Sequence, residues 1–282
     1  MKKLILLLFL IVFCAGVGKG IYFVRDGFTE RRIHGLKNWI TPDWDEEVEL
    51  ALDQPFYYLG RGRQCFAFAS KDGKYVLKLP RTDIYKTPFW ARVLPVKAYR
   101  EQLEAKNLCR QNFVLGSFDI SIHELRNQTG LLAVHLGQSF PQGKKIILVD
   151  KLGIKHSLRR EKTPFVLQYK KPILMNEFSL ARKNGDTQKA EKILDAMLDV
   201  IVERAEKGIL NRDRSFLRNY GFDGEKGYQI DVGSFYRNPK IEGRAAYEKS
   251  IRDSIDPVLE WLAKTDPEML DYLNKTLNRR CF

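Results

Sequence analysis

The chain has little cysteine, and what it has is scattered. Its four cysteines stand far apart, with no CxxC pair and no paired spacing with histidine. A disulfide framework and a structural zinc site are therefore not expected. This pattern favours a reducing compartment, where thiols stay unpaired. The residues concerned are Cys14, Cys65, Cys109 and Cys281.

Internal repeats, low-complexity segments and long Lys/Arg blocks are also absent from the sequence. Without a basic block or regularly interleaved aromatics, no nucleic acid partner is expected. The formal net charge is nevertheless +13 in 282 residues. That excess favours an acidic partner such as a nucleotide, a phospholipid surface or an acidic protein, or else it serves solubility. With 44% apolar residues, the chain can bury a sizeable core in one large or two modest domains.

The one long apolar run lies at the N-terminus, from Leu4 to Gly18. It is shorter than the roughly 20 residues of a membrane span, but it reaches Val24 if Lys19 extends its ammonium to the interface. Residues 1–24 are thus predicted to be a membrane anchor or a signal peptide. The anchor is favoured, with the main domain cytoplasmic, because the basic residues after the run outnumber those before it. The alternative is secretion after signal cleavage.

Residues 25–55 are predicted to form a linker and a short helix. Thr41 is the expected N-cap, Pro42 takes the first helical position and Pro55 ends the helix. Three strands are expected within residues 56–80, because apolar and polar residues alternate around the turn "KDGK".

The rest of the chain is predicted to contain both helices and strands. Helical spacing follows in residues 97–111, "TGLLAVHLG" and "KKIILVDKLG" are expected to be paired strands, and "PFVLQY" is another strand. From Leu174 onward helices dominate, with a long amphipathic one over residues 189–208 and breaks expected at Pro257 and Pro267. Strands first and helices later indicate an α+β protein with two lobes and a cleft, the N-lobe at about 56–170 and the C-lobe at about 171–282.

Three features of the strand-rich part suggest phosphate binding. Gly60 and Gly62 let the backbone approach a phosphate closely, although Cys65 stands where a third glycine is common and a simple tight hairpin is the alternative. Lys78 in "YVLKLP" is placed to hold α- and β-phosphates, unless it merely faces solvent. Glu104 is the carboxylate expected to pair with Lys78, because Leu108 one turn later would pack inward, and Glu101 is the alternative.

A late stretch, "GILNRDRSFLRNYGFDGEKGYQIDVGSF", carries the remaining polar candidates. Asp231 and Asn219 provide the carboxylate and amide oxygens that suit a divalent cation. Asp213 is placed to accept or orient an alcohol proton. The alternative is that these side chains only cap and turn the chain.

Together these pieces resemble the protein-kinase-like superfamily. "LGRGRQCFAFA" is similar to its Gly-rich loop, "YVLKLP" to its VAIK strand, "LNRDRSFLRN" to its HRD loop and "IDVGSF" to its DFG segment. The resemblance covers about residues 56–236 and implies a bilobal kinase-like fold. It also implies that Lys78 holds ATP phosphates and pairs with Glu104, that Asp213 is the catalytic base, and that Asn219 and Asp231 bind Mg²⁺. Adenine would lie between the lobes at "PFVLQY".

The sequence also departs from the family pattern. Asn211 replaces the histidine of HRD, Val232 replaces the phenylalanine of DFG, the spacing from Asp213 to Asn219 is one residue longer, and no APE segment follows. These departures indicate an atypical member rather than a typical protein kinase. The expected function is ATP- and Mg²⁺-dependent transfer of a γ-phosphoryl group to an alcohol of a protein, lipid or small molecule. The alternatives are an inactive kinase-like binding module or scaffold at the membrane, and a structural membrane-anchored protein with coincidental motifs.

Overall fold

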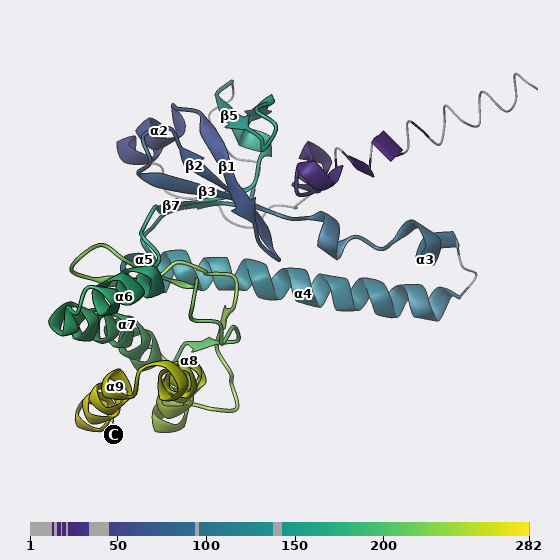
Figure 1. Cartoon of the computed structure of the whole chain (residues 1–282). Helices are drawn as coiled ribbons and strands as arrows, with labels where there is room; N and C mark the ends of the chain where they lie inside the picture. Colours follow the sequence, from purple (N-terminus) through teal and green to yellow (C-terminus); the bar gives the residue numbers. More distant parts are fainter. Residues whose placement is uncertain are drawn as a thin grey trace, which may run out of the picture. The chain divides into compact units, whose positions relative to one another are not determined.

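A computed structural model describes residues 13, 16, 17, 19, 20, 22–33, 45–93, 96–137 and 143–281 (Figure 1). The chain divides into two compact units. The first unit takes Met1–Lys86 and Ala133–Leu167, and the second takes Thr87–Leu132 and Gln168–Phe282. The first holds a sheet and the second is mainly helical, so the predicted α+β class is confirmed in this coarse form.

The division differs from the predicted lobes in one respect. Residues 87–132, placed by sequence in the N-lobe, belong to the second unit. The chain crosses between the units three times, after Lys86, after Leu132 and after Leu167, and the last two crossings fall inside strands.

The first unit is organised by a sheet that has seven strands in the described part of the chain. Their order across the sheet is β4-β7-β3-β2-β1-β5-β6. The bounds are β1 Phe56–Arg61, β2 Cys65–Ser70, β3 Tyr75–Pro80, β4 Leu131–His135, β5 Lys145–Val149, β6 Lys155–Arg159 and β7 Phe165–Tyr169. The three strands predicted in residues 56–80 are confirmed as β1, β2 and β3, which pair antiparallel in sequence order.

The core of this unit follows from the two-residue period of its strands. Phe66 and Phe68 on β2 are fully buried, while the residues between them are half-buried. Phe28, from the segment before the sheet, packs edge-on against both rings, with centroids 5.3 and 5.1 Å away. Burying each such ring stabilises the fold by about 1.5–3 kcal/mol. The segment around Phe28, which the sequence suggested was linker, is therefore part of the packed unit.

Short helices complete the first unit. They are α2 Glu46–Leu52 and the 3₁₀ turns η1 Glu30–Arg32, η2 Asp83–Tyr85 and η3 Arg160–Lys162. The predicted short helix is confirmed, but it begins later than expected. Asp45 is its N-cap and accepts a hydrogen bond from the Val48 N–H at 2.9 Å. Thr41 and Pro42 lie outside the described residues.

The second unit is built from helices and two small sheets. The helices are α3 Phe89–Val93, α4 Lys97–Glu124, α5 Arg126–Thr129, α6 Leu174–Lys183, α7 Thr187–Glu206, α8 Gly243–Thr265 and α9 Pro267–Arg280. The strands are β8 Leu210–Asn211, β9 Tyr220–Phe222, β10 Gly227–Gln229 and β11 Phe235–Tyr236, which pair as β9 with β10 and β8 with β11.

Helix α7 is the centre of this unit and has the predicted amphipathic pattern. Its buried residues recur at helical spacing, and it packs against α6, α8 and α9. The Asp186 side chain caps its N-terminus, and Gly208, with φ of +66°, follows its C-terminus as expected for a left-handed end. The hairpin of β9 and β10 lies directly on α7, because a Cβ on Gly227 would come within 2.2 Å of the Ala196 carbonyl oxygen.

Two sequence-based expectations are wrong. The strands β4 and β5 do form, but they lie at opposite parts of the sheet order and do not pair, since β5 pairs with β1 and β6. Pro257 does not end a helix, because α8 continues through it with buried residues on both sides, including Ile255 and Val258. Pro267 does begin a new helix, as predicted.

The N-terminal prediction concerns residues that are mostly outside the structural description, including 1–12. Among the helices of the described residues, none has the length and apolar character of a membrane span.

Candidate functional site

The late polar stretch forms one loop system in the second unit, fastened at two points by backbone hydrogen bonds. Near one end, the Arg212 N–H donates to the Ser234 carbonyl oxygen at 2.9 Å, next to the pairing of β8 with β11. Near the other, the Ile230 N–H donates to the Asn219 carbonyl oxygen at 2.8 Å, next to the pairing of β9 with β10. The structure thus brings Asp213, Asn219 and Asp231 into the same loop system.

Asp213 is held by a local hydrogen-bond pattern. Its backbone N–H donates to Oδ1 of Asn211 at 3.0 Å, and its own Oδ1 accepts the N–H of Ser215 at 2.9 Å. Asn211, which stands where the kinase family has histidine, is therefore the residue that orders the loop. The Asp213 side chain is half-buried, and one carboxylate oxygen is used by the turn. This turn is the capping role that sequence analysis kept as an alternative.

Asn219 is the most unusual member of the group. Its side chain is only 7% exposed, and its Nδ2 is buried without a hydrogen-bond partner in the described part of the chain. A buried amide group left unpaired costs about 1–3 kcal/mol, so native proteins keep few of them. Asp231, which follows β10 directly, has an exposed side chain. The unpaired Nδ2 is a hydrogen-bond donor and suits an acceptor such as a phosphate oxygen, whereas a cation would bind the amide oxygen of Asn219 or the exposed Asp231 carboxylate.

Helix α4 fixes the backbone that follows Asp231. Ser117, fully buried on α4, donates its hydroxyl hydrogen to the Val232 carbonyl oxygen and accepts the Phe235 N–H at 2.7 Å. Ser121, one turn later, donates to the Ser117 carbonyl at 2.6 Å and lies 3.4 Å from the Val232 oxygen. This contact was not predicted, because the helical spacing recognised in the sequence covers residues 97–111 and the two serines lie beyond it.

Arg212 also contacts α4. Its guanidinium lies over the Phe113 ring, 4.9 Å from the centroid. The residue before the candidate base is therefore held by an aromatic ring.

In the first unit, the glycine hairpin joins β1 and β2. The register of the two strands shifts between Tyr58 and Gly60, and the Gly62 N–H donates to the Cys65 carbonyl oxygen at 2.8 Å. A Cβ added to Gly60 would meet no atom within 4 Å of the described chain, and one added to Gly62 would meet only the Cys65 oxygen at 3.5 Å. Packing in this structure does not require glycine at either position.

Lys78 lies on β3, in the same sheet, where its Cα is paired with that of Ala67 on β2. Its side chain is half-buried between the fully buried Leu77 and Leu79. The structure therefore brings Lys78 and the glycine hairpin into one set of adjacent strands.

An arginine–aspartate cluster, which was not predicted from the sequence, supports the tip of this hairpin. Arg81, just after β3, donates to the carbonyl oxygens of Gly62 and Arg63 at 3.4 and 3.1 Å. Asp83 accepts hydrogen bonds from both Arg81 and Arg32. Burial disfavours the charged form of Asp83, but the two guanidinium groups outweigh it and lower its pKa. The cluster links the segment before the sheet to the glycine hairpin.

The local structure around Glu104 gives little support to its predicted pairing with Lys78. Glu104 is exposed on α4, and Leu108, expected to pack inward beside it, is 57% exposed. Asn107 is the buried residue of that turn instead. Glu101, the alternative, lies 3.8 Å from Lys97 in an exposed pair on the same helix. Lys78 and Glu104 belong to different compact units, and their pairing stays a prediction.

The metal site would rest on few protein ligands. No group of three or more His, Cys, Asp or Glu side chains suited to a metal occurs within the described residues. A magnesium site built with substrate phosphates needs only one or two carboxylates from the protein. Asp231 provides one carboxylate and Asn219 one amide oxygen, which are the kinds of ligand that such a site needs.

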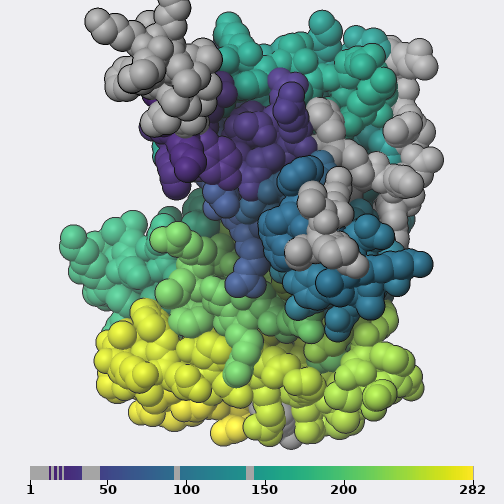
Figure 2. All heavy atoms as spheres, turned by 90° about the vertical axis from the view of Figure 1, so that its right-hand side faces the viewer, coloured from purple at the N-terminus to yellow at the C-terminus, as the bar shows by residue number. Residues whose placement is uncertain are grey.

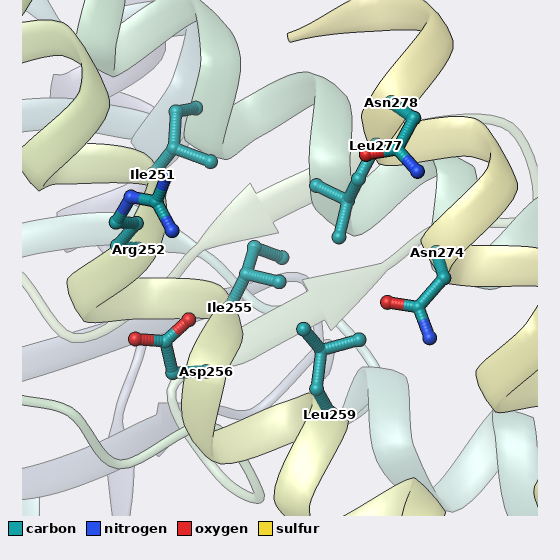
Figure 3. Close-up of a pocket in the computed structure, with 8 residues that line it drawn as sticks. All are labelled: Ile251, Arg252, Ile255, Asp256, Leu259, Asn274, Leu277 and Asn278. Atoms are coloured by element: carbon teal, nitrogen blue, oxygen red, sulfur yellow. The ribbon is translucent and has the colours of Figure 1, made fainter. Parts of the chain in front are cut away.

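A hollow elsewhere in the second unit does not involve these residues. It measures about 360 Å³ and is lined by side chains of α8 and α9 (Figure 3). Four of them are apolar, Ile251, Ile255, Leu259 and Leu277, and four are polar, Arg252, Asp256, Asn274 and Asn278.

Comparisons with known proteins show a weak likeness to a solved structure. No protein-family model and no curated protein matches the chain. A solved structure, a crystal structure of WbdD, is similar with a TM-score of 0.35 and 16% sequence identity. The match covers 76% of this chain and 35% of that chain, so this chain spans about a third of its length. A likeness at this level assigns neither fold family nor activity.

Proposed function

We propose that this chain is a phosphotransferase of the atypical kinase-like type, using ATP and Mg²⁺ to phosphorylate an alcohol. The observation that carries the proposal is the loop system of the second unit. There, backbone hydrogen bonds at Arg212 and Asn219 hold the segments that carry Asp213, Asn219 and Asp231, and the buried Nδ2 of Asn219, which has no partner among the described residues, could donate to a phosphate oxygen. The sequence motifs supply the rest: two glycines in a hairpin and a strand lysine in the first unit.

Each residue has a proposed role. Gly60 and Gly62 allow the hairpin backbone to approach the phosphates, and Lys78 neutralises α- and β-phosphate charge. Asn219 and Asp231 hold the metal through oxygen atoms. Bound Mg²⁺ supplies charge neutralisation on the phosphates. Asp213 accepts or orients the proton of the acceptor hydroxyl.

The supporting structure gives these residues fixed positions. Asn211 and Ser215 hold Asp213 in its turn, and Ser117 holds the backbone after Asp231. Positioning of this kind is most of what a protein contributes to phosphoryl transfer, because the phosphate chemistry needs little covalent help. Adenine is proposed to bind at β7, where the chain passes from the first unit to the second at Leu167.

A second function is nucleotide binding without transfer. It is favoured by one contact: Oδ1 of Asp213 already accepts the Ser215 N–H, as it would in a purely structural turn. Cys65, which stands where a third glycine is common in such loops, also favours nucleotide binding without transfer. In that case the chain would be a scaffold held at a membrane.

The location is also a proposal. Residues 1–24 would anchor the chain, with the main domain in the cytoplasm, where ATP is available. A reporter fused after Phe282 that is active on the outer side of the membrane would contradict this.

The test of function is transfer of labelled γ-phosphate from ATP by the full chain, with Mg²⁺ present or chelated. Candidate protein, lipid and small-molecule acceptors are supplied together. Metal-dependent transfer supports the phosphotransferase. A melting temperature that rises with Mg²⁺·ATP while no transfer occurs supports the binding module. A melting temperature that does not respond to millimolar ATP argues against both.

A further inference from the structure

The second unit carries an exposed group of aromatic and basic side chains that the proposed reaction does not use. We call it the aromatic–basic patch, and it comprises Phe89, Trp90, Tyr99, Lys106 and Arg110. Phe89 is 81% exposed, Trp90 55% and Tyr99 43%, and both basic residues are exposed. Figure 2 shows the segment of α3 and the first turns of α4, in blue, on the face turned toward the viewer.

A ring contact and a shared helical face group most of these residues. Trp90 of α3 and Tyr99 of α4 lie with ring centroids 6.3 Å apart and planes 31° from parallel. Along α4, Tyr99, Lys106 and Arg110 are spaced by seven and then four residues, which places them on one helical face. The aromatic pair therefore continues into a basic stripe.

The surroundings of the patch are also basic. The first fourteen residues of α4 contain four basic side chains and two acidic ones, within a chain of net charge +13. In Figure 1, the N-terminal half of α4 extends away from α5, α6, α7, α8 and α9, so these helices of its own unit leave it uncovered. A surface of this composition favours an acidic partner.

We propose that the aromatic–basic patch docks on an anionic phospholipid bilayer. Trp and Tyr have an apolar ring and a polar end, which suits the interface between lipid head groups and acyl chains. Lys106 and Arg110 would meet the head-group charge, each strengthening membrane affinity by about a factor of five. A nucleic acid would instead call for repeated basic blocks, which the sequence lacks.

This contact is separate from the proposed anchor and from the proposed reaction. An N-terminal anchor would keep the patch close to lipid and raise its effective concentration. The docking itself depends on residues of α3 and α4 that carry no proposed catalytic role. Transfer activity and docking therefore fail or succeed independently.

The experiment uses the full chain with an environment-sensitive fluorescent amino acid in place of Phe89. A second version carries the same probe in place of Asp271, an exposed residue of α9. Each is mixed with vesicles of phosphatidylcholine alone or with about 30% phosphatidylserine, a content that gives an anionic surface. The expected result is a blue shift and increased emission at position 89, with anionic vesicles only, and no change at position 271.

A matched charge change tests the basic stripe. Lys106→Gln with Arg110→Gln should weaken the response at position 89 by about 30-fold in lipid concentration. Lys275→Gln with Arg279→Gln, on α9, removes the same charge at the same spacing and should leave the response unchanged. Equal loss in both pairs would mean that only net charge matters and would overturn the assigned patch.

Other results would also overturn the proposal. An equal response with neutral vesicles would exclude recognition of anionic lipid. A response at position 89 that depends on protein concentration without vesicles would assign the patch to a second copy of the chain. No response with any vesicle would leave the patch without a lipid role.

Discussion

The backbone N–H of Ile230 donates to the carbonyl oxygen of Asn219 at 2.8 Å. Asn219 is one candidate metal ligand, and Ile230 directly precedes the other, Asp231. The spacing from Asp213 to Asn219 is one residue longer than the kinase family has. The longer loop ends at Asn219, directly before the β9–β10 hairpin. Phe216, in the middle of the loop, is buried.

Asn219→Leu should separate stability from activity. Leucine has nearly the shape of asparagine and removes a buried amide whose Nδ2 has no partner among the residues that the structure describes. The free energy of unfolding should stay unchanged or rise by about 1 kcal/mol, because an unpaired polar group is lost. Transfer activity should be lost with the metal ligand. Chemical denaturation and the transfer assay measure the two effects.

Asn211→Leu is the matched contrast to this change. It removes the acceptor of the Asp213 N–H, so the free energy of unfolding should fall by about 1–3 kcal/mol. If both leucine variants destabilise the protein equally, Asn219 has only a structural role.

Gly60→Ala and Gly62→Ala should weaken nucleotide binding without unfolding the hairpin. Neither added Cβ meets a crowded site, so the melting temperature should hardly change. A phosphate lying against the backbone would be displaced by the methyl groups, and the dissociation constant for ATP should rise about tenfold or more. Calorimetric titration of ATP measures this effect.

Gly73→Ala is the control in the neighbouring turn. Gly73 has φ of +73°, so alanine there should cost about 1–2 kcal/mol of stability while ATP affinity stays the same. Unchanged ATP affinity in all three variants would remove the glycine hairpin from the nucleotide site.

Ser117→Ala tests the contact of α4 with the chain after Asp231. The change leaves the buried Phe235 N–H without an acceptor and the Val232 carbonyl without its donor. The free energy of unfolding should fall by about 1–3 kcal/mol. Amide hydrogen exchange should quicken around residues 232–235 before the core of α7 is affected.

Ser179→Ala is a suitable control because its hydroxyl only donates within its own helix, to Met175 at 2.8 Å. The substitution should change the free energy of unfolding by no more than about 0.5 kcal/mol. Equal exchange around residues 232–235 in both variants would contradict the role given to Ser117.

Asp150→Asn should lower stability in a pH-dependent way. Burial disfavours the charged form of Asp150, but hydrogen bonds from His156 and from the Ile154 and Leu152 amides, with the charge of Arg25, give it a lowered pKa. A lowered folded pKa stabilises the fold above the unfolded pKa of about 3.9, and that stability is lost as pH falls through the folded value.

Wild type should therefore be more stable than the variant at pH 7, and the two melting curves should converge as the pH falls well below 4. A constant difference across this range would exclude a charge-based role for Asp150.

The local elements were predictable because their signals are local. The β1, β2 and β3 strands alternate every two residues around a tight turn, and α7 has both a periodic apolar face and a terminal glycine. The sheet order was not predictable in the same way. Strand β5 pairs with β1 across more than ninety residues of chain, since Phe56 pairs with Leu148, and neither strand's sequence identifies the other as its partner.

The same distinction applies to the candidate site. Asp213, Asn219 and Asp231 could be chosen from residue type and spacing. The Ser117 contact and the bond from Arg32 to Asp83 join residues that are distant in sequence and meet only after folding. The inward packing expected of Leu108 failed because α4 buries a different face at that turn, the one carrying Asn107.

The most direct test compares wild type with Asp213→Asn in the labelled-ATP transfer assay, with ATP binding measured in parallel. Asparagine keeps an Oδ1 that can accept the Ser215 N–H, so the turn should survive while the proton acceptor is lost. Asp271→Asn, exposed on α9, is the control and should behave as wild type. Our account predicts at least a hundredfold loss of transfer in Asp213→Asn, on the order of what a general base contributes, with nearly unchanged ATP binding. Transfer at the wild-type rate in Asp213→Asn would contradict it.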